Sequence, residues 1–181
     1  MGGSVRFRSM FVVAMSLYLF VANQPVFASP GDTCALPSSL RDELSKKYPE
    51  SRLVGLADLT EYDRKLFQKD HGTHCPGVAR VNFYGDGKPT WALVLISGEN
   101  PKRKAELVVA RQIEDLWEIR SLDTTNGTPV VWREGPGKYD GLYGEETIQA
   151  KRPVIVFCGL ESWAIVYIWT GKKVEKVQVS D

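Results

Sequence analysis

From Val78 to its end, the chain is a series of short apolar or alternating runs separated by turns, most of which contain Gly, Pro, Asn or Asp. No helical pattern of ten residues lies between these runs, whereas parallel strands need crossover connections of roughly that length or more. The pattern therefore predicts a mainly antiparallel β-sheet. Its expected strands cover residues 78–84, 91–97, 105–113, 116–122, 129–132, 147–150, 154–158, 163–169 and 174–179.

Two of these runs are apolar on both faces. In residues 163–169, alternation places Tyr167 and two tryptophans on one face, and Val166 and Ile168 on the other. Residues 91–96 show the same property. A strand with two apolar faces is stable only where other elements cover both of them. We therefore expect these two strands to be central, and the tryptophans to serve mainly as core residues.

Two short helices are expected before the strands. Leu40, Leu44 and Tyr48 recur at helical spacing in the first. The second begins after Thr60, an N-cap residue type with Asp63 three positions later, and has an expected apolar face of Tyr62, Leu66 and Phe67. The predicted fold class is α+β: two short N-terminal helices on or beside a mainly antiparallel sheet of about eight or nine strands, arranged as an open barrel or a sandwich.

The first residues have the pattern of an export signal. Arg6 and Arg8 precede a mostly apolar run over residues 10–22, and small residues at Val26 and Ala28 have the spacing of a cleavage site. The apolar run is too short to cross a bilayer core of about 30 Å as a helix. The sequence predicts cleavage after Ala28 and a secreted or periplasmic protein.

The expected organisation is a signal peptide over residues 1–28 and one α+β domain over residues 29–181. The full chain has 23 basic and 22 acidic side chains. Cleavage removes Arg6 and Arg8, which leaves 21 basic and 22 acidic side chains. Such a balance provides no electrostatic reason to expect nucleic acid or an anionic membrane as a partner. No later apolar run has the length of a membrane span. The expected partner is another envelope or secreted protein.

Three cysteines, Cys34, Cys75 and Cys158, remain after cleavage. An oxidising compartment favours one disulfide and leaves one thiol, and three pairings are possible. Cys34 and Cys75 flank the helical section, whereas Cys158 lies inside an expected strand. These positions favour the pair Cys34–Cys75, with Cys158 as a small, inert core residue.

The clearest local motif runs from Asn82 to Leu93. It resembles the D-x-D-G-D-G-x-x-D hairpin of FG-GAP and VCBS-type repeats, which implies a calcium-binding turn between two strands. Asn82, Tyr84 and Thr90 occupy three of the acidic positions, so that Asp86 is the one carboxylate left. The resemblance therefore implies a retained turn and a lost calcium site. The wider layout is similar to bacterial exported proteins, and that similarity implies no activity.

Residues 70–79 contain the chain's two histidines, His71 and His74. The segment resembles the H-G-T-H box of subtilisin-like proteases, but the serine and aspartate boxes of that family are missing, so acyl transfer is not expected. Of the residue types that bind metals, His71, His74 and Asp86 are the candidate ligands in this chain. They lack the spacing that would complete four ligands, and we predict neither a metal nor another cofactor.

A Gly- and Pro-rich segment over residues 133–145 is expected to be a long loop, and long loops on a rigid sheet often carry binding residues. Tyr139 and Tyr143 in this loop, with Trp132 beside it, are the predicted binding residues. The predicted function is a non-enzymatic exported binding or interaction protein, such as an envelope accessory factor or an inhibitor. The alternative is a small envelope hydrolase in which His71 or His74 meets an acid and a nucleophile only in the folded chain.

Overall fold

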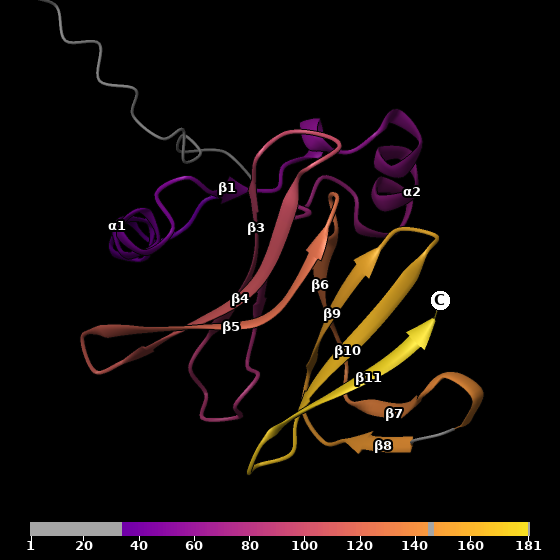
Figure 1. The fold of residues 1–181 in the computed structure, drawn as a ribbon. Coiled ribbons are helices and arrows are strands. Elements are labelled where there is room, and N and C mark those ends of the chain that lie inside the picture. The colour runs from indigo at the N-terminus through magenta and orange to yellow at the C-terminus, as the bar shows by residue number, and fades with distance from the viewer. Residues whose placement is uncertain (1–33, 145–146, 181) are drawn as a thin grey trace, which may run out of the picture.

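A computed structural model describes residues 34–144 and 147–180 (Figure 1). The expected signal peptide and its cleavage site lie outside these residues. The described chain forms eleven strands in three sheets, and every strand pairing is antiparallel, which confirms the predicted direction. The described residues have more strands than the expected eight or nine, because residues 52–53 and 137–140 were not expected to form strands, and the strands divide among three sheets.

The largest sheet has five strands, with β3 (Thr90–Ser97) and β4 (Lys104–Ile113) in its centre. Its long edge strand is β5 (Leu116–Asn126). On the other side, β1 (Arg52–Leu53) and β2 (Val78–Val81) pair with different parts of β3.

The second sheet has the order β11-β10-β9-β6. These strands are β6 (Val130–Glu134), β9 (Val154–Gly159), β10 (Trp163–Trp169) and β11 (Val174–Ser180). It meets the first sheet where β2 and β6 approach each other, and the Val131 N–H donates a 2.8 Å hydrogen bond to Pro76 O. The two sheets share the largest hydrophobic core, which includes Val94, Leu107, Val109, Val131, Ile155, Phe157 and Tyr167.

Both strands with two apolar faces are central, as predicted. Helix α1 (Ser38–Lys47) packs Leu40 and Leu44 against the outer face of β3 and β4, while the inner face of β3 lies in the shared core. In β10, Tyr167 points into the shared core, and Val166 and Ile168 belong to a separate cluster on the opposite face. Burial on both sides therefore explains why these strands carry almost no polar residues.

A third sheet covers that opposite face of β10. It consists of β7 (Gly137–Asp140) and β8 (Thr147–Ala150), whose Tyr139 and Ile148 pack on the apolar cluster of the second sheet (Figure 1). The expected long loop over residues 133–145 is therefore wrong, because β6 extends to Glu134 and β7 follows. A strand as short as β7, with one large apolar side chain, cannot be recognised from its own sequence. It is stabilised by packing on the apolar face of the second sheet.

Helix α2 (Glu61–His71) begins as predicted, since Thr60 Oγ1 accepts a 3.1 Å hydrogen bond from the Asp63 N–H. Its expected apolar face is wrong in part. Phe67 is buried in the shared core, but Tyr62 is 60% exposed and its hydroxyl donates to Glu161 Oε1 at 2.6 Å. The helix therefore inserts one ring at an end of the core, and does not lie flat on a sheet as α1 does.

Asp123 on β5 joins the two larger sheets on the side away from β2 and β6. Its carboxylate accepts hydrogen bonds from the Tyr167 hydroxyl on β10 and from Lys176 Nζ on β11, the latter at 2.6 Å. Burial acts to raise the pKa of Asp123, but these two donors hold that pKa below its usual value. The bonds thus favour the ionised carboxylate in the folded protein.

We expect Asp123→Asn to lower the free energy of unfolding by about 2 kcal/mol at pH 7, because hydrogen bonds to a charged group are lost. A carboxylate with a depressed folded pKa stabilises the protein above its unfolded pKa of about 4, and this contribution disappears as the pH falls through the folded pKa. Urea unfolding at pH 7 and pH 3 should therefore show the difference between wild type and variant shrinking at pH 3. Glu43→Gln, which removes an exposed pair with Lys46, is the control and should cost less than about 0.5 kcal/mol. An equal difference at both pH values would contradict this role of the carboxylate.

Candidate functional site

An open cleft of about 710 Å³ lies between the end of α2, the turn before β2, and β6. His71 and His74, predicted together as candidate metal or catalytic residues, line it with Trp132, which was predicted to act with Tyr139 and Tyr143. Arg80, Trp91 and Arg133 also line it and were not predicted. The cleft therefore combines aromatic and charged side chains from segments far apart in the chain.

One wall of the cleft is a row of stacked rings. Phe67 and His71 are four residues apart on α2, and their ring centroids are 4.7 Å apart. The His71 ring is in turn 4.8 Å from that of Trp132 on β6. Trp132 Nε1 donates to Glu134 Oε2 at 2.9 Å, which orients the indole. Neighbouring rings are tilted by 36° and 39° to each other, so the result is an angled apolar surface.

His71 contributes to this wall as a neutral ring. Burial among its neighbours lowers its pKa below the usual 6.5, and the opposing effects of Asp70 and Glu134 are smaller. An imidazole with a depressed pKa is uncharged at neutral pH. The row of rings is therefore uncharged at neutral pH.

Two arginines provide the charge of the cleft. Arg80 on β2 lies opposite Trp91 on β3, with its guanidinium 5.7 Å from the indole centroid. Arg133 follows Trp132 on β6. Within residues 34–144 and 147–180, neither guanidinium forms an ion pair. Asp70 also lines the cleft, and Glu134 lies beside its ring wall. A guanidinium without an ion pair is a donor that suits a carboxylate or a phosphate.

The disulfide joins Cys34 to Cys75, which confirms the favoured pairing. Cys75 is buried and lines the cleft, so the bond ties the start of the described chain to the turn that carries His74. Gly77 in this turn is packed so closely that a Cβ there would lie 2.4 Å from Val54 O. Cys158 is unpaired and buried, and burial raises the pKa of its thiol to about 11. As predicted, it is an inert core residue.

Of the candidate metal residues, His71 and His74 both line the cleft, whereas Asp86 does not. No three His, Cys, Asp or Glu side chains of the described chain come together as a metal-binding group. In the hairpin that resembles a calcium loop, Asn82 Oδ1 accepts from the Gly87 N–H at 3.3 Å and Asp86 Oδ1 accepts from the Lys88 N–H at 2.9 Å. These oxygens therefore stabilise the turn itself, which has Gly85 and Gly87 in left-handed conformations.

The other two predicted binding residues lie away from the cleft. Tyr139 is half-buried beneath the second sheet, and its hydroxyl donates to Gly135 O at 2.6 Å. Tyr143 lies in the turn η2 (Leu142–Gly144) and is 86% exposed. Sequence reasoning missed Arg80 and Arg133, because each is an ordinary polar residue at the end of a strand. Only the approach of β2 to β6 brings them to one cleft.

The cleft does not assemble an acyl-transfer site. Asp70 precedes His71 in α2, but no serine or threonine of the described chain lines the cleft, and its one sulfur belongs to the disulfide. Nucleophilic catalysis of that kind needs a hydroxyl or thiol within reach of the histidine. The cleft instead offers aromatic rings and two guanidinium groups.

The chain matches no protein-family model, no curated protein and no solved structure. Among the helices of the described residues, none is long and apolar enough to cross a membrane.

Proposed function

We propose that the protein is an exported, non-enzymatic binding protein that holds an acidic segment of an envelope or secreted partner protein in the cleft of α2, β2 and β6. The observation that carries this proposal is the pair of arginines, Arg80 and Arg133, which form no ion pair in the described residues, beside the contacting rings of His71 and Trp132. Arginine pairs with carboxylates through two parallel hydrogen bonds, and an aromatic side chain packs well on other rings.

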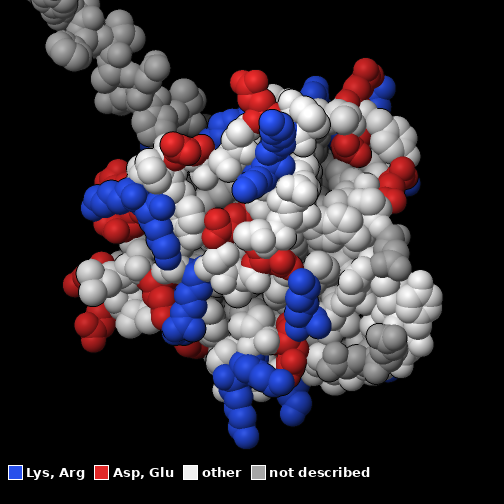
Figure 2. Space-filling model, viewed as in Figure 1, with Lys and Arg blue, Asp and Glu red and all other residues white. Residues whose placement is uncertain are grey.

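Export is supported by two independent features. Residues 1–28 have the pattern of a signal peptide, and a disulfide such as Cys34–Cys75 persists in oxidising compartments. Basic and acidic side chains alternate across most of the face seen in Figure 2. Recognition of an acidic segment would then depend on the local charge of the cleft, because the overall charge is close to neutral.

The test uses protein purified from the extracytoplasmic fraction of expressing cells, with an expected N-terminal residue of Ser29. A library of random peptides displayed on phage is selected against it, and the enriched peptides are measured by fluorescence anisotropy. We expect enriched peptides to combine acidic and aromatic residues. Trp132→Ala and the double variant Arg80→Ala/Arg133→Ala should each weaken their binding at least about tenfold, or 1.4 kcal/mol.

Arg120→Ala is the matched control, because this exposed arginine on β5 lies outside the cleft. Its affinity should equal that of the wild type, and added salt should weaken wild-type binding more than binding by the double variant. Peptides without acidic enrichment, or equal affinity for the double variant, would refute the assignment of the cleft.

A further inference from the structure

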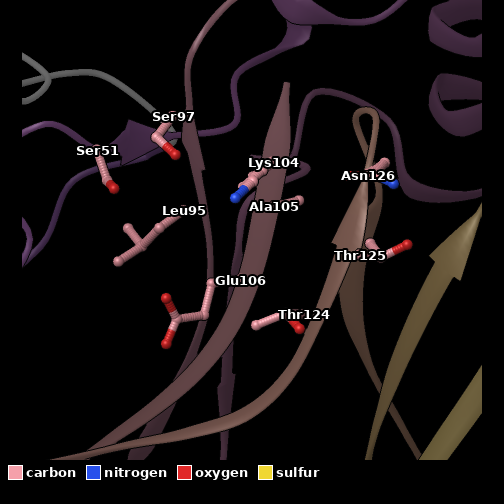
Figure 3. Close-up of a pocket in the computed structure, with 9 residues that line it drawn as sticks. All are labelled: Ser51, Leu95, Ser97, Lys104, Ala105, Glu106, Thr124, Thr125 and Asn126. Carbon is pink, nitrogen blue, oxygen red and sulfur yellow. The ribbon is translucent and has the colours of Figure 1, made fainter. Parts of the chain in front are cut away.

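A second hollow, of about 400 Å³, lies on the outer face of the five-stranded sheet and shares no residue with the cleft. Figure 3 shows it between the segment before β1 and the strands β3, β4 and β5. Leu95, which is buried, contributes an apolar side chain from that face, whereas the side chain of the neighbouring Ala105 lies in the core on the other face. Its remaining lining is polar and contains one cation, Lys104, and one anion, Glu106.

Strand register arranges the polar groups in two rows. Lys104 lies opposite Ser97 on one side and opposite Asn126 on the other, which makes a row with hydrogen-bond donors at every position. Two residues further along β4, Glu106 lies opposite Leu95 and Thr124. Two residues of a strand correspond to about 7 Å. A positive row and a negative row therefore border the same hollow, one step apart.

The two charges are not paired with each other. Within residues 34–144 and 147–180, Lys104 has no ion pair or side-chain hydrogen bond, and Glu106 accepts only a long 3.4 Å bond from the Tyr48 hydroxyl. In Figure 3 both side chains extend from β4 to the side of Ser51. They face into the hollow.

The same chain provides an internal comparison. At the same two-residue spacing, Lys138 and Asp140 form an ion pair of 2.8 Å, and so do Lys173 and Glu175. Lysine and an acid in this relation therefore pair when nothing separates them. Lys104 and Glu106 stay apart and leave one charge of each sign available at the hollow.

We propose that this hollow binds a small zwitterion, a free α-amino acid or a short peptide, with Lys104 and Ser97 at its carboxylate and Glu106 at its ammonium group. An uncharged polyol would leave both charges uncompensated. A metal cation would be repelled by Lys104, and a phosphate by Glu106. A zwitterion compensates both charges, and the hydroxyls of the lining supply the remaining hydrogen bonds.

The experiment is isothermal titration calorimetry of the mature protein with each of the twenty free amino acids and with glycylglycine as probes. We expect saturable binding of at least one probe. Its N-acetyl and amide derivatives, each with one charge removed, should bind at least about tenfold more weakly. The dipeptide distinguishes the two sources of the zwitterion, because its ammonium and carboxylate groups are further apart than those of a free amino acid, and Lys104 and Glu106 are held at one spacing on β4.

Lys104→Met and Glu106→Gln should each weaken binding at least about tenfold, and both substitutions lie outside the cores, so thermal unfolding should show intact folds. Lys138→Met, at the paired lysine of β7, is the matched control and should bind as the wild type does. The proposal is overturned if no probe binds at up to roughly 10 mM, if singly charged derivatives bind equally well, or if both variants keep full affinity. The cleft is tested with other variants and other ligands, so a negative result for the hollow does not decide whether the cleft binds peptides.

Discussion

The double variant Cys34→Ser/Cys75→Ser is expected to lose about 4 kcal/mol of unfolding free energy. The bond closes a loop with a sequence separation of 41 residues, and a crosslink of that span restricts the unfolded chain far more than the folded one. A domain of this size has a total stability of about 5–15 kcal/mol. The expected loss is therefore a large part of the stability of the protein.

Guanidinium unfolding followed by tryptophan fluorescence measures this loss, and wild type with a reductant should approach the double variant. Cys158→Ala is the control, since it removes a buried thiol without breaking a crosslink, and should cost about 1 kcal/mol. The double variant should also bind cleft peptides more weakly, because Cys75 anchors the turn that carries His74. A loss below about 1 kcal/mol would show that packing alone holds this turn.

The second large effect is expected at Phe157, where replacement by alanine should cost about 3–5 kcal/mol. This side chain on β9 is fully buried in the core shared by the two larger sheets. Its ring lies edge-on to Trp163, with centroids 5.1 Å apart. Alanine would leave a cavity in the core between the two larger sheets, and the close-packed neighbours could move little to fill it.

Urea unfolding measures the cost, and Phe157→Leu separates lost volume from lost ring geometry with an expected cost of about 1–1.5 kcal/mol. Leu116→Ala is the matched surface control, because Leu116 is 76% exposed, and it should change stability by less than about 0.5 kcal/mol. Equal costs for Phe157→Ala and Leu116→Ala would contradict a single core shared by the two sheets.

Short-range patterns predicted much of the fold. Alternation in β10 indicated two covered faces, and the structure has one in the shared core and one beneath β7 and β8. Thr60 with Asp63 marked the start of α2, because an N-cap is a contact between residues three apart. The pairing of Cys34 with Cys75 followed from which elements each cysteine flanks. The first two of these features involve neighbours in the chain or the period of one element, whereas the disulfide joins residues 41 positions apart and was inferred from where its cysteines lie between elements.

The two candidate sites depend on contacts that no local pattern contains. Trp132 was predicted to act with Tyr139 and Tyr143 but shares its cleft with His71, which is 61 positions earlier in the printed sequence. Lys104 and Glu106 are an ordinary polar pair in the sequence, and only the register of β3, β4 and β5 places them in a hollow with Ser97 and Thr124.

By itself, the sequence determined both helices, every strand of the described residues except β1 and β7, the antiparallel pairing and the central position of the doubly apolar strands, because each follows from side-chain periodicity and turn chemistry. The tertiary structure alone decided that eleven strands divide into three sheets, and that β2 meets β6. The physical reason is that sheet division depends on which apolar faces bury each other, a property of distant residue pairs. The cleft and the hollow both result from that choice.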